Sequence, residues 1–153
     1  MYKLIKRNDD DFLYHEVWEE DGMVVEHFGE VGDPGERRVH PIPPDSDEDQ
    51  VMESILRPVA AKGFGEVEDE ELIRVHVEQA RSPQGDDTDL DKWHQLEDQL
   101  DDLLGETGLG HCNGGEVSAD SVVVYIFVVD AAIAGEVVAN ALDELKAFRR
   151  VEE

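Results

Sequence analysis

The sequence predicts an α+β fold made of two small units, and three observations support this prediction. Residues 1–68 alternate short aromatic and β-branched runs with turns rich in glycine and proline, and they contain one helical pattern. Residues 69–153 follow the order strand, helix, strand, strand, helix, strand. The charged segment 68–71 separates the two parts, and 153 residues are enough for two small domains. We therefore expect domains at 1–68 and 69–153.

The first unit is predicted to begin with an antiparallel sheet. Its strand-like runs alternate apolar and polar residues or are rich in aromatic and β-branched side chains, at residues 2–4, 12–19, 23–28 and 37–42. The pair Asp21-Gly22 favours a tight hairpin between the second and third runs. The segment Gly32–Gly35 favours a further turn, because proline presets one φ angle and glycine accepts a positive one.

A helix should follow this sheet. Ser46 is the expected N-cap, and the neighbouring carboxylates suit the positive end of the helix dipole. The apolar stripe recurs at helical spacing, at Val51, Ile55 and Val59. Pro58 predicts a kink or a short helix. Lys62-Gly63 should end the helix, and residues 64–67 should lead out as a short strand.

Two segments of the first unit resemble a WGR domain. They are residues 24–36, VVEHFGEVGDPGE, and residues 61–67, AKGFGEV, with the predicted helix between them. In that family an antiparallel sheet carries a Trp-Gly-Arg motif, followed by a glycine turn and a helix that ends in a Lys-Gly-Tyr-like segment. The resemblance covers residues 1–68 and implies a WGR-like sheet and helix there.

Three candidate binding residues stand where the family has its motif: Phe28, Gly29 and Glu30. In DNA-repair polymerases of the poly(ADP-ribose) type, the aromatic residue and the arginine contact DNA ends. A carboxylate in place of the arginine repels phosphate, so the resemblance implies the fold and argues against inherited DNA binding. In the alternative interpretation, Phe28 packs on a sheet face and the glycines permit a bulge and a turn. A nucleic-acid alternative would use the bases Lys3, Lys6, Arg7, Arg37 and Arg38.

The second unit is predicted to open with a strand and a long helix. In residues 72–78, apolar residues alternate with polar ones, which predicts a strand that buries Ile73, Val75 and Val77. A loop at 82–85 should precede a helix that starts at Thr88 or Asp89. The apolar positions of this helix recur at helical spacing, at Leu90, Trp93, Leu96, Leu100, Leu103 and Leu104.

The remaining elements complete the predicted order. A hairpin around Asp120-Ser121 should join residues 116–119 to residues 122–129. The run 122–129 has no polar alternation, so we expect a central strand that is covered on both faces or nearly so. Asp130 should cap the last helix, and residues 148–151 should add an edge strand. This order is that of the ferredoxin-like βαββαβ plait, with two helices on one face of an antiparallel sheet.

The charge of the chain limits its partners. There are 39 acidic and 13 basic residues, a formal net charge of −26. Such a surface repels nucleic-acid backbones and anionic lipids and attracts basic proteins, although it also serves solubility in a salty cytoplasm. We expect a protein partner, no nucleic acid and no membrane. A single cysteine excludes an internal disulfide framework, and no apolar run is long enough to span a bilayer, so a cytoplasmic location is expected.

Residues 105–115 are predicted as a glycine-rich loop after a helix that ends at Gly105, and they contain His111, Cys112 and Asn113. A phosphate cradle would need glycines that lead from a strand into a helix, whereas these lead from a helix into a strand. Adjacent residues of an extended chain point apart, so His111 would be a poor base for Cys112, although another histidine could approach. The simplest interpretation is a turn that positions a hairpin.

Metal and cofactor sites are not predicted. The six histidines show no i, i+4 pairing, and there is no Cys-x-x-Cys motif. Two Asp-rich stretches, residues 45–49 and 86–89, lack the central glycine and distal glutamate of a calcium loop.

Four carboxylates of the predicted helix pair at i, i+4: Glu97 with Asp101, and Asp98 with Asp102. They form either a solvated face or a docking surface for an arginine-rich partner. We therefore predict a non-catalytic binding or regulatory protein that recognises a protein partner with a basic surface, for instance an inhibitor of a basic nuclease. Two alternatives remain, a nucleic-acid-associated WGR-type module and a small enzyme that uses the 108–115 segment with Cys112 and a histidine. The sequence predicts no oligomeric state.

Overall fold

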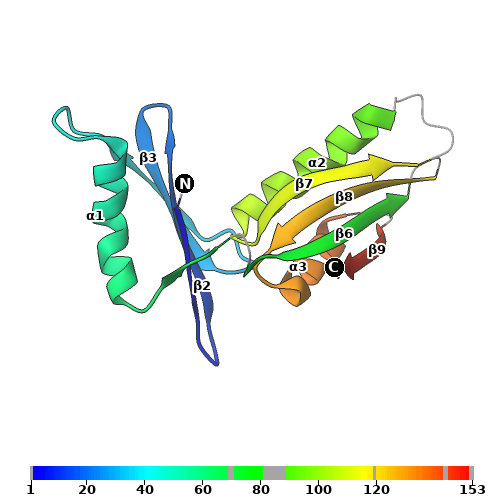
Figure 1. Cartoon of the computed structure of the whole chain (residues 1–153), viewed down its shortest axis with the longest axis horizontal. Coiled ribbons are helices and arrows are strands. Elements are labelled where there is room, and N and C mark those ends of the chain that lie inside the picture. Colours follow the sequence, from blue (N-terminus) through cyan, green and yellow to red (C-terminus); the bar gives the residue numbers. More distant parts are fainter. Residues whose placement is uncertain (1, 69–70, 81–88, 119, 143–144, 152–153) are drawn as a thin grey trace. The chain divides into compact units, whose positions relative to one another are not determined.

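The computed structural model describes residues 2–68, 71–80, 89–118, 120–142 and 145–151. The chain divides into two compact units, Met1–Asp69 and Glu70–Glu153. Within the described residues, the protein is α+β, with three helices and two antiparallel sheets of five and four strands (Figure 1). The predicted loop at 82–85 and the predicted helix start at Thr88 lie outside these residues. No helix of the described segments is both long and apolar enough to cross a membrane.

The first sheet has the strand order β4-β3-β2-β1-β5. Its strands are β1 (Tyr2–Arg7), β2 (Phe12–Glu20), β3 (Met23–Glu30), β4 (Glu36–Pro41) and β5 (Gly65–Glu66). Asp21 and Gly22 both have positive φ angles, +53° and +78°, as a two-residue hairpin turn requires. This turn pairs Glu20 with Met23 and thereby fixes which residues of β2 and β3 share a face.

Helix α1 (Glu48–Ala61) packs against β2 and β3, where Met52 joins a core with Val17 and Val24. The predicted N-cap is wrong by one residue. Asp47 caps the helix. Its carboxylate accepts a hydrogen bond from the Gln50 backbone amide, and the Gln50 side-chain oxygen accepts one from the Asp47 backbone amide.

The helix runs through Pro58 and ends at Ala61, with Lys62-Gly63 following as predicted. Pro58 lacks the amide hydrogen that would bond to the turn before it, but only three helical residues follow it. The next residue, Val59, is buried and holds the last turn in the helix. Pro58 therefore does not shorten the helix.

The second sheet has the strand order β7-β8-β6-β9. Its strands are β6 (Ile73–Ala80), β7 (Gly110–Val117), β8 (Ser121–Val128) and β9 (Leu145–Arg150), and its helices are α2 (Asp89–Glu106) and α3 (Ala131–Ala141). Helix α2 packs on β7 and β8, while α3 packs on β9 and on α2. Both helices therefore cover the same face of the sheet (Figure 1).

The core of the second unit is apolar. Many of its buried side chains come from α2, α3 and the helix-facing positions of β6 and β8, among them Leu96, Leu100, Leu104, Val138, Val75, Val77, Val124 and Ile126. Strand β8 is central, as predicted. Coverage on both faces is incomplete, because Tyr125 and Phe127 on the face away from the helices are half-buried.

The predicted loop at 105–115 is wrong. Helix α2 continues through Gly105 to Glu106, and strand β7 begins at Gly110. A Cβ atom at Gly110 would overlap the carbonyl oxygen of Phe127, and one at Gly115 would overlap that of Val123. These glycines therefore allow β7 to lie close against β8. Gly114, with φ +82°, lies where the strand register shifts.

Candidate functional site

Helix α2 carries the predicted carboxylates on one side. Asp98, Asp101 and Asp102 are exposed and Glu97 is half-buried, while the leucines of the helix face the core. We call Glu97, Asp98, Asp101 and Asp102 the acidic ridge. No basic residue occupies the last turn of α2, where the helix dipole is negative and favours cations. Carboxylates four residues apart also repel each other, by about 0.2–0.5 kcal/mol per pair. The acidic ridge therefore costs the helix stability.

Cys112 lies on strand β7 and faces the helix side of the sheet. Its amide donates to Asp101 Oδ1 at 3.0 Å, and its thiol donates to the Glu97 carbonyl at 3.5 Å. Burial, together with the charges of Asp101 and Glu97, raises the pKa of Cys112 to about 12. The thiol is therefore protonated at neutral pH and is a poor nucleophile.

The structure does not bring His111, Cys112 and Asn113 together as a reactive group. His111 pairs across the sheet with Phe127 and is exposed on the face opposite Cys112, as alternation along a strand requires. Asn113 is exposed, at the register shift of β7. No cluster of three or more histidine, cysteine or carboxylate side chains that could hold a metal ion occurs in the described part of the chain.

At the WGR-like positions, Phe28 packs on a sheet face. Its ring stacks on His15 with centroids 4.9 Å apart and planes inclined by 9°, and the Arg38 guanidinium lies 5.0 Å from its centroid. A Cβ atom at Gly29 would lie 2.7 Å from Gly35 Cα, so this glycine allows the loop after β3 to approach, and no register shift marks a bulge there. Glu30 is exposed.

The five bases that the nucleic-acid alternative would use do not form one patch. Lys3, Arg7 and Arg37 belong to one face of the sheet, and Lys6 and Arg38 to the other. Their charged groups lie against different partners within the unit: Glu16 for Lys3, the Lys62 carbonyl for Lys6, and the rings of Phe12, Trp18 and Phe28 for Arg7, Arg37 and Arg38. The five bases therefore do not share a single surface that could bind a phosphate backbone.

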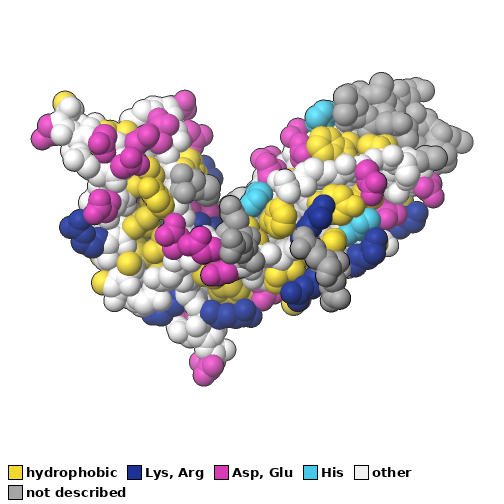
Figure 2. Space-filling view, in the orientation of Figure 1, with side chains coloured by type: hydrophobic (Ala, Val, Ile, Leu, Met, Phe, Trp, Pro, Cys, Tyr) yellow, Lys and Arg dark blue, Asp and Glu magenta, His cyan; other side chains and the backbone are white. Residues whose placement is uncertain are grey.

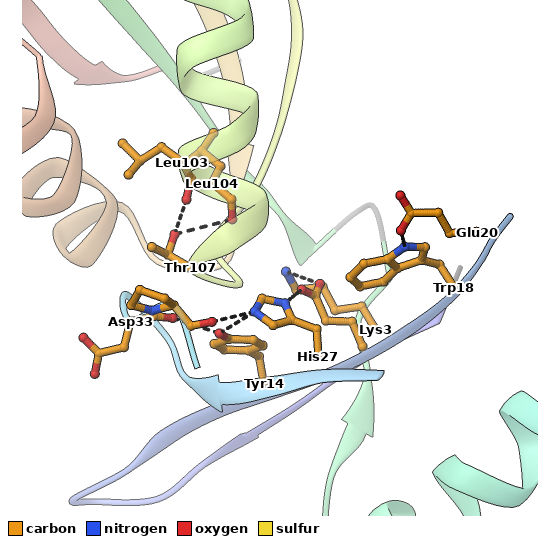
Figure 3. A network of polar contacts seen from close by, with 11 residues as sticks. Lys3, Tyr14, Trp18, Glu20, His27, Asp33, Leu103, Leu104 and Thr107 are labelled. Atoms are coloured by element: carbon orange, nitrogen blue, oxygen red, sulfur yellow. Dashed lines mark hydrogen bonds and ion pairs between the residues drawn. The ribbon is translucent and has the colours of Figure 1, made fainter. Parts of the chain in front are cut away.

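A buried polar network occupies one face of this sheet (Figure 3). His27 Nδ1 lies 2.8 Å from Glu16 Oε1, and its Nε2 lies 2.6 Å from the Pro34 carbonyl oxygen. Both partners only accept hydrogen bonds, so both ring nitrogens carry protons and the imidazole is positively charged. The bond to Glu16 raises the pKa of His27 and outweighs the opposing effect of burial.

Two further residues complete what we call the His27 network, which comprises Lys3, Tyr14, Glu16 and His27. Lys3 Nζ lies 3.3 Å from Glu16 Oε2, so one carboxylate serves two cations. The Tyr14 hydroxyl donates to the Asp33 carbonyl at 2.8 Å and lies 3.2 Å from His27 Nε2. The network ties the loop after β3 to the sheet.

The other face of the sheet has its own histidine and carboxylate cluster. Glu26 accepts from His15 at 2.7 Å and from His40 at 2.9 Å. Burial alone would raise the pKa of Glu26, but the bonds from His40 and His15 lower it below its usual value. As in the His27 network, the polar groups are occupied by one another. Both clusters therefore serve to hold the first sheet together.

The sequence patterns indicated neither cluster, although the hairpin turn carries a signal for the Glu16–His27 pair. A two-residue turn at Asp21-Gly22 places Glu16 opposite His27. A histidine and a glutamate at paired positions of adjacent strands are close enough to bond. The hairpin prediction alone therefore could have identified this pair.

The chain has no match among protein-family models, curated proteins or solved structures.

Proposed function

We propose that this chain is a non-catalytic binding protein whose acidic ridge recognises a protein partner with a basic surface. One observation carries the proposal. The ridge places like charges four residues apart on a largely exposed side of α2, with no base in the last turn of the helix. A complementary cation from a partner would relieve this repulsion and gain from steering by the net charge of −26.

We propose a WGR-like fold for the first unit and a ferredoxin-like plait for the second. In the second unit, the order β7-β8-β6-β9 places its first and third strands at the centre, with both helices on one face. In the first unit, the sheet, the helix and the closing residues 64–67 follow the order that the resemblance implies. Neither fold specifies an activity.

The other two hypotheses have less support. The protonated Cys112 thiol, with His111 on the opposite sheet face, does not favour an enzyme of the 108–115 segment. The division of Lys3, Lys6, Arg7, Arg37 and Arg38 over two faces does not favour a DNA-binding first unit. The main rival is solvation, in which the carboxylates serve solubility alone.

Paired double variants separate docking from solvation. Asp98→Asn with Asp102→Asn removes two ridge charges, and Asp9→Asn with Asp10→Asn removes two exposed charges from the β1–β2 turn. Each chain is titrated calorimetrically with a deca-arginine peptide at 0.05 M salt. We expect the ridge variant to bind about fivefold more weakly, from two surface ion pairs of about 0.2–1 kcal/mol each, and the turn variant to bind like the parent.

The same variants test for a natural partner. Affinity capture from the cells that make the protein should recover a basic protein with the parent chain and with the turn variant, and lose it with the ridge variant. Equal binding of deca-arginine by both variants, or equal recovery in the capture, would show that only bulk charge acts and would overturn the proposal.

A further inference from the structure

The face of the second sheet that lies away from α2 and α3 differs from the rest of this acidic chain. Strand pairing arranges its side chains in rows across the sheet. The first row is His111, Phe127 and Arg74, and the second is Tyr125, His76 and Arg149. Each row thus holds two rings and ends in an arginine. We call these six residues the platform. Figure 2 shows hydrophobic, histidine and basic side chains gathered on this face.

The arginines of the platform are available to a ligand. Neither Arg74 nor Arg149 forms an ion pair with any residue that the structure describes. Arg149 is exposed, and the half-buried Arg74 lies with its guanidinium carbon 4.3 Å from the Tyr125 ring centroid. The Arg74 Nε is buried without a hydrogen-bond partner among the described residues, and a guanidinium that stacks on tyrosine can take a second flat group on its other face.

Among the strand residues that the structure describes, the carboxylates of this face lie in the next row, which contains Glu116, Val123, Glu78 and Ala147. Both acids there already have partners. Glu78 lies 3.1 Å from His76 and 3.4 Å from Lys146, and Glu116 accepts from the Tyr125 hydroxyl at 3.2 Å. The platform rows themselves hold two arginines and no acid, and the neighbouring carboxylates contact them only through His76 and Tyr125.

We propose that the platform binds single-stranded nucleic acid. Unpaired bases stack on aromatic rings and guanidinium planes, and adjacent cations hold the phosphates. Phe127 and the stacked pair of Arg74 on Tyr125 offer two such surfaces, two residues or about 6.8 Å apart along β8. Arg149, at the end of the second row, is the cation that is left to hold a phosphate beside these surfaces. Rings combined with unpaired arginines match an unstacked strand better than they match an acidic protein segment, which needs no stacking surface.

The net charge does not forbid this site. Helix α2 is about 10 Å across, and it lies on the far side of the sheet from the platform. At 0.15 M salt, charges more than about 8 Å apart are largely screened from each other. The ridge reaches the sheet at β7, where Asp101 accepts a hydrogen bond from the Cys112 amide next to His111. Arg74 on β6 and Arg149 on β9 are two and three strands away from β7, or about 10 and 14 Å, so the ridge is largely screened from the arginines at this salt concentration.

The test is a fluorescence anisotropy titration of the intact chain into labelled U12 and dT12 oligonucleotides at 0.15 M salt. Arg149→Gln and Arg150→Gln form a matched pair, because both arginines are exposed and adjacent but pair with residues on opposite faces of β6. We expect saturable binding to at least one oligonucleotide. The ratio of the affinities for U12 and dT12 gives the preference for RNA or DNA. Arg149→Gln should weaken binding about fivefold and lower the salt slope by about 0.7, while Arg150→Gln leaves both unchanged.

Phe127→Leu tests the stacking surface, because leucine keeps an apolar side chain and loses the ring. We expect about tenfold weaker binding, with an unchanged circular dichroism spectrum. Absence of binding by the parent chain at 1 mM protein would overturn the proposal. Equal losses in Arg149→Gln and Arg150→Gln, or platform-dependent binding of a deca-glutamate peptide without oligonucleotide binding, would also overturn it.

Discussion

The two units of this chain bury different chemistry. The first sheet encloses ionised groups, with Glu16 and His27 each only 2% exposed and directly bonded to each other. The second unit buries a continuous apolar layer between its sheet and two helices, in which Leu100 and Val124 are fully inaccessible. Stability of the first unit should therefore depend on charge pairing and pH, whereas stability of the second should depend on packing volume.

The largest expected effect comes from breaking the His27 network. Glu16→Gln leaves Lys3 and His27 as buried cations without their shared carboxylate, which should lower the free energy of unfolding of the first unit by about 3–5 kcal/mol. Urea unfolding followed by Trp18 fluorescence in a Trp93→Phe background measures this loss. Glu30→Gln is the control, because Glu30 is exposed on the neighbouring strand and its change should stay within about 0.5 kcal/mol. Equal effects of the two variants would refute a special role of the buried pair.

Two glycine substitutions test packing in the second unit, and their smaller effects on the free energy of unfolding should have opposite signs. Gly115→Ala places a methyl group against the Val123 carbonyl and the Trp93 indole, and should destabilise the unit by about 1–3 kcal/mol. Gly105→Ala meets no atom within 4 Å inside α2 and should stabilise the unit by about 0.5–1 kcal/mol. Urea unfolding followed by Trp93 in a Trp18→Phe background measures both. An unchanged free energy of unfolding in Gly115→Ala would mean that β7 does not lie close to β8.

These comparisons also show what the sequence could predict. Local chemistry identified the hairpin at Asp21-Gly22, the helix end at Lys62-Gly63 and the cap at Asp130, because each depends on neighbouring residues alone. It failed at Gly110 and Gly115, which resemble loop residues but lie in a strand because β8 leaves no room for a side chain.

The candidate sites divide in the same way. The acidic ridge follows from helical spacing, so the sequence could predict it. The platform could not be predicted, because its rows depend on the pairing of β6 with β8 and β9, which are far apart in the chain. Likewise, Phe28 was a candidate binding residue because of a family resemblance, whereas its position is set by packing on His15. Non-local pairing is therefore the information that the sequence patterns lacked.

The pH dependence of the first unit tests the central claim most directly. The pKa of His27 is raised in the folded state, so its contribution to stability is fully present below the unfolded value of about 6.5 and is lost as the pH rises through the folded pKa. The Trp18 unfolding midpoint should therefore fall from pH 6 to pH 8.5, and by less in His27→Gln. A fall that is the same in the parent and in His27→Gln would contradict a charged His27 as the group that holds this sheet.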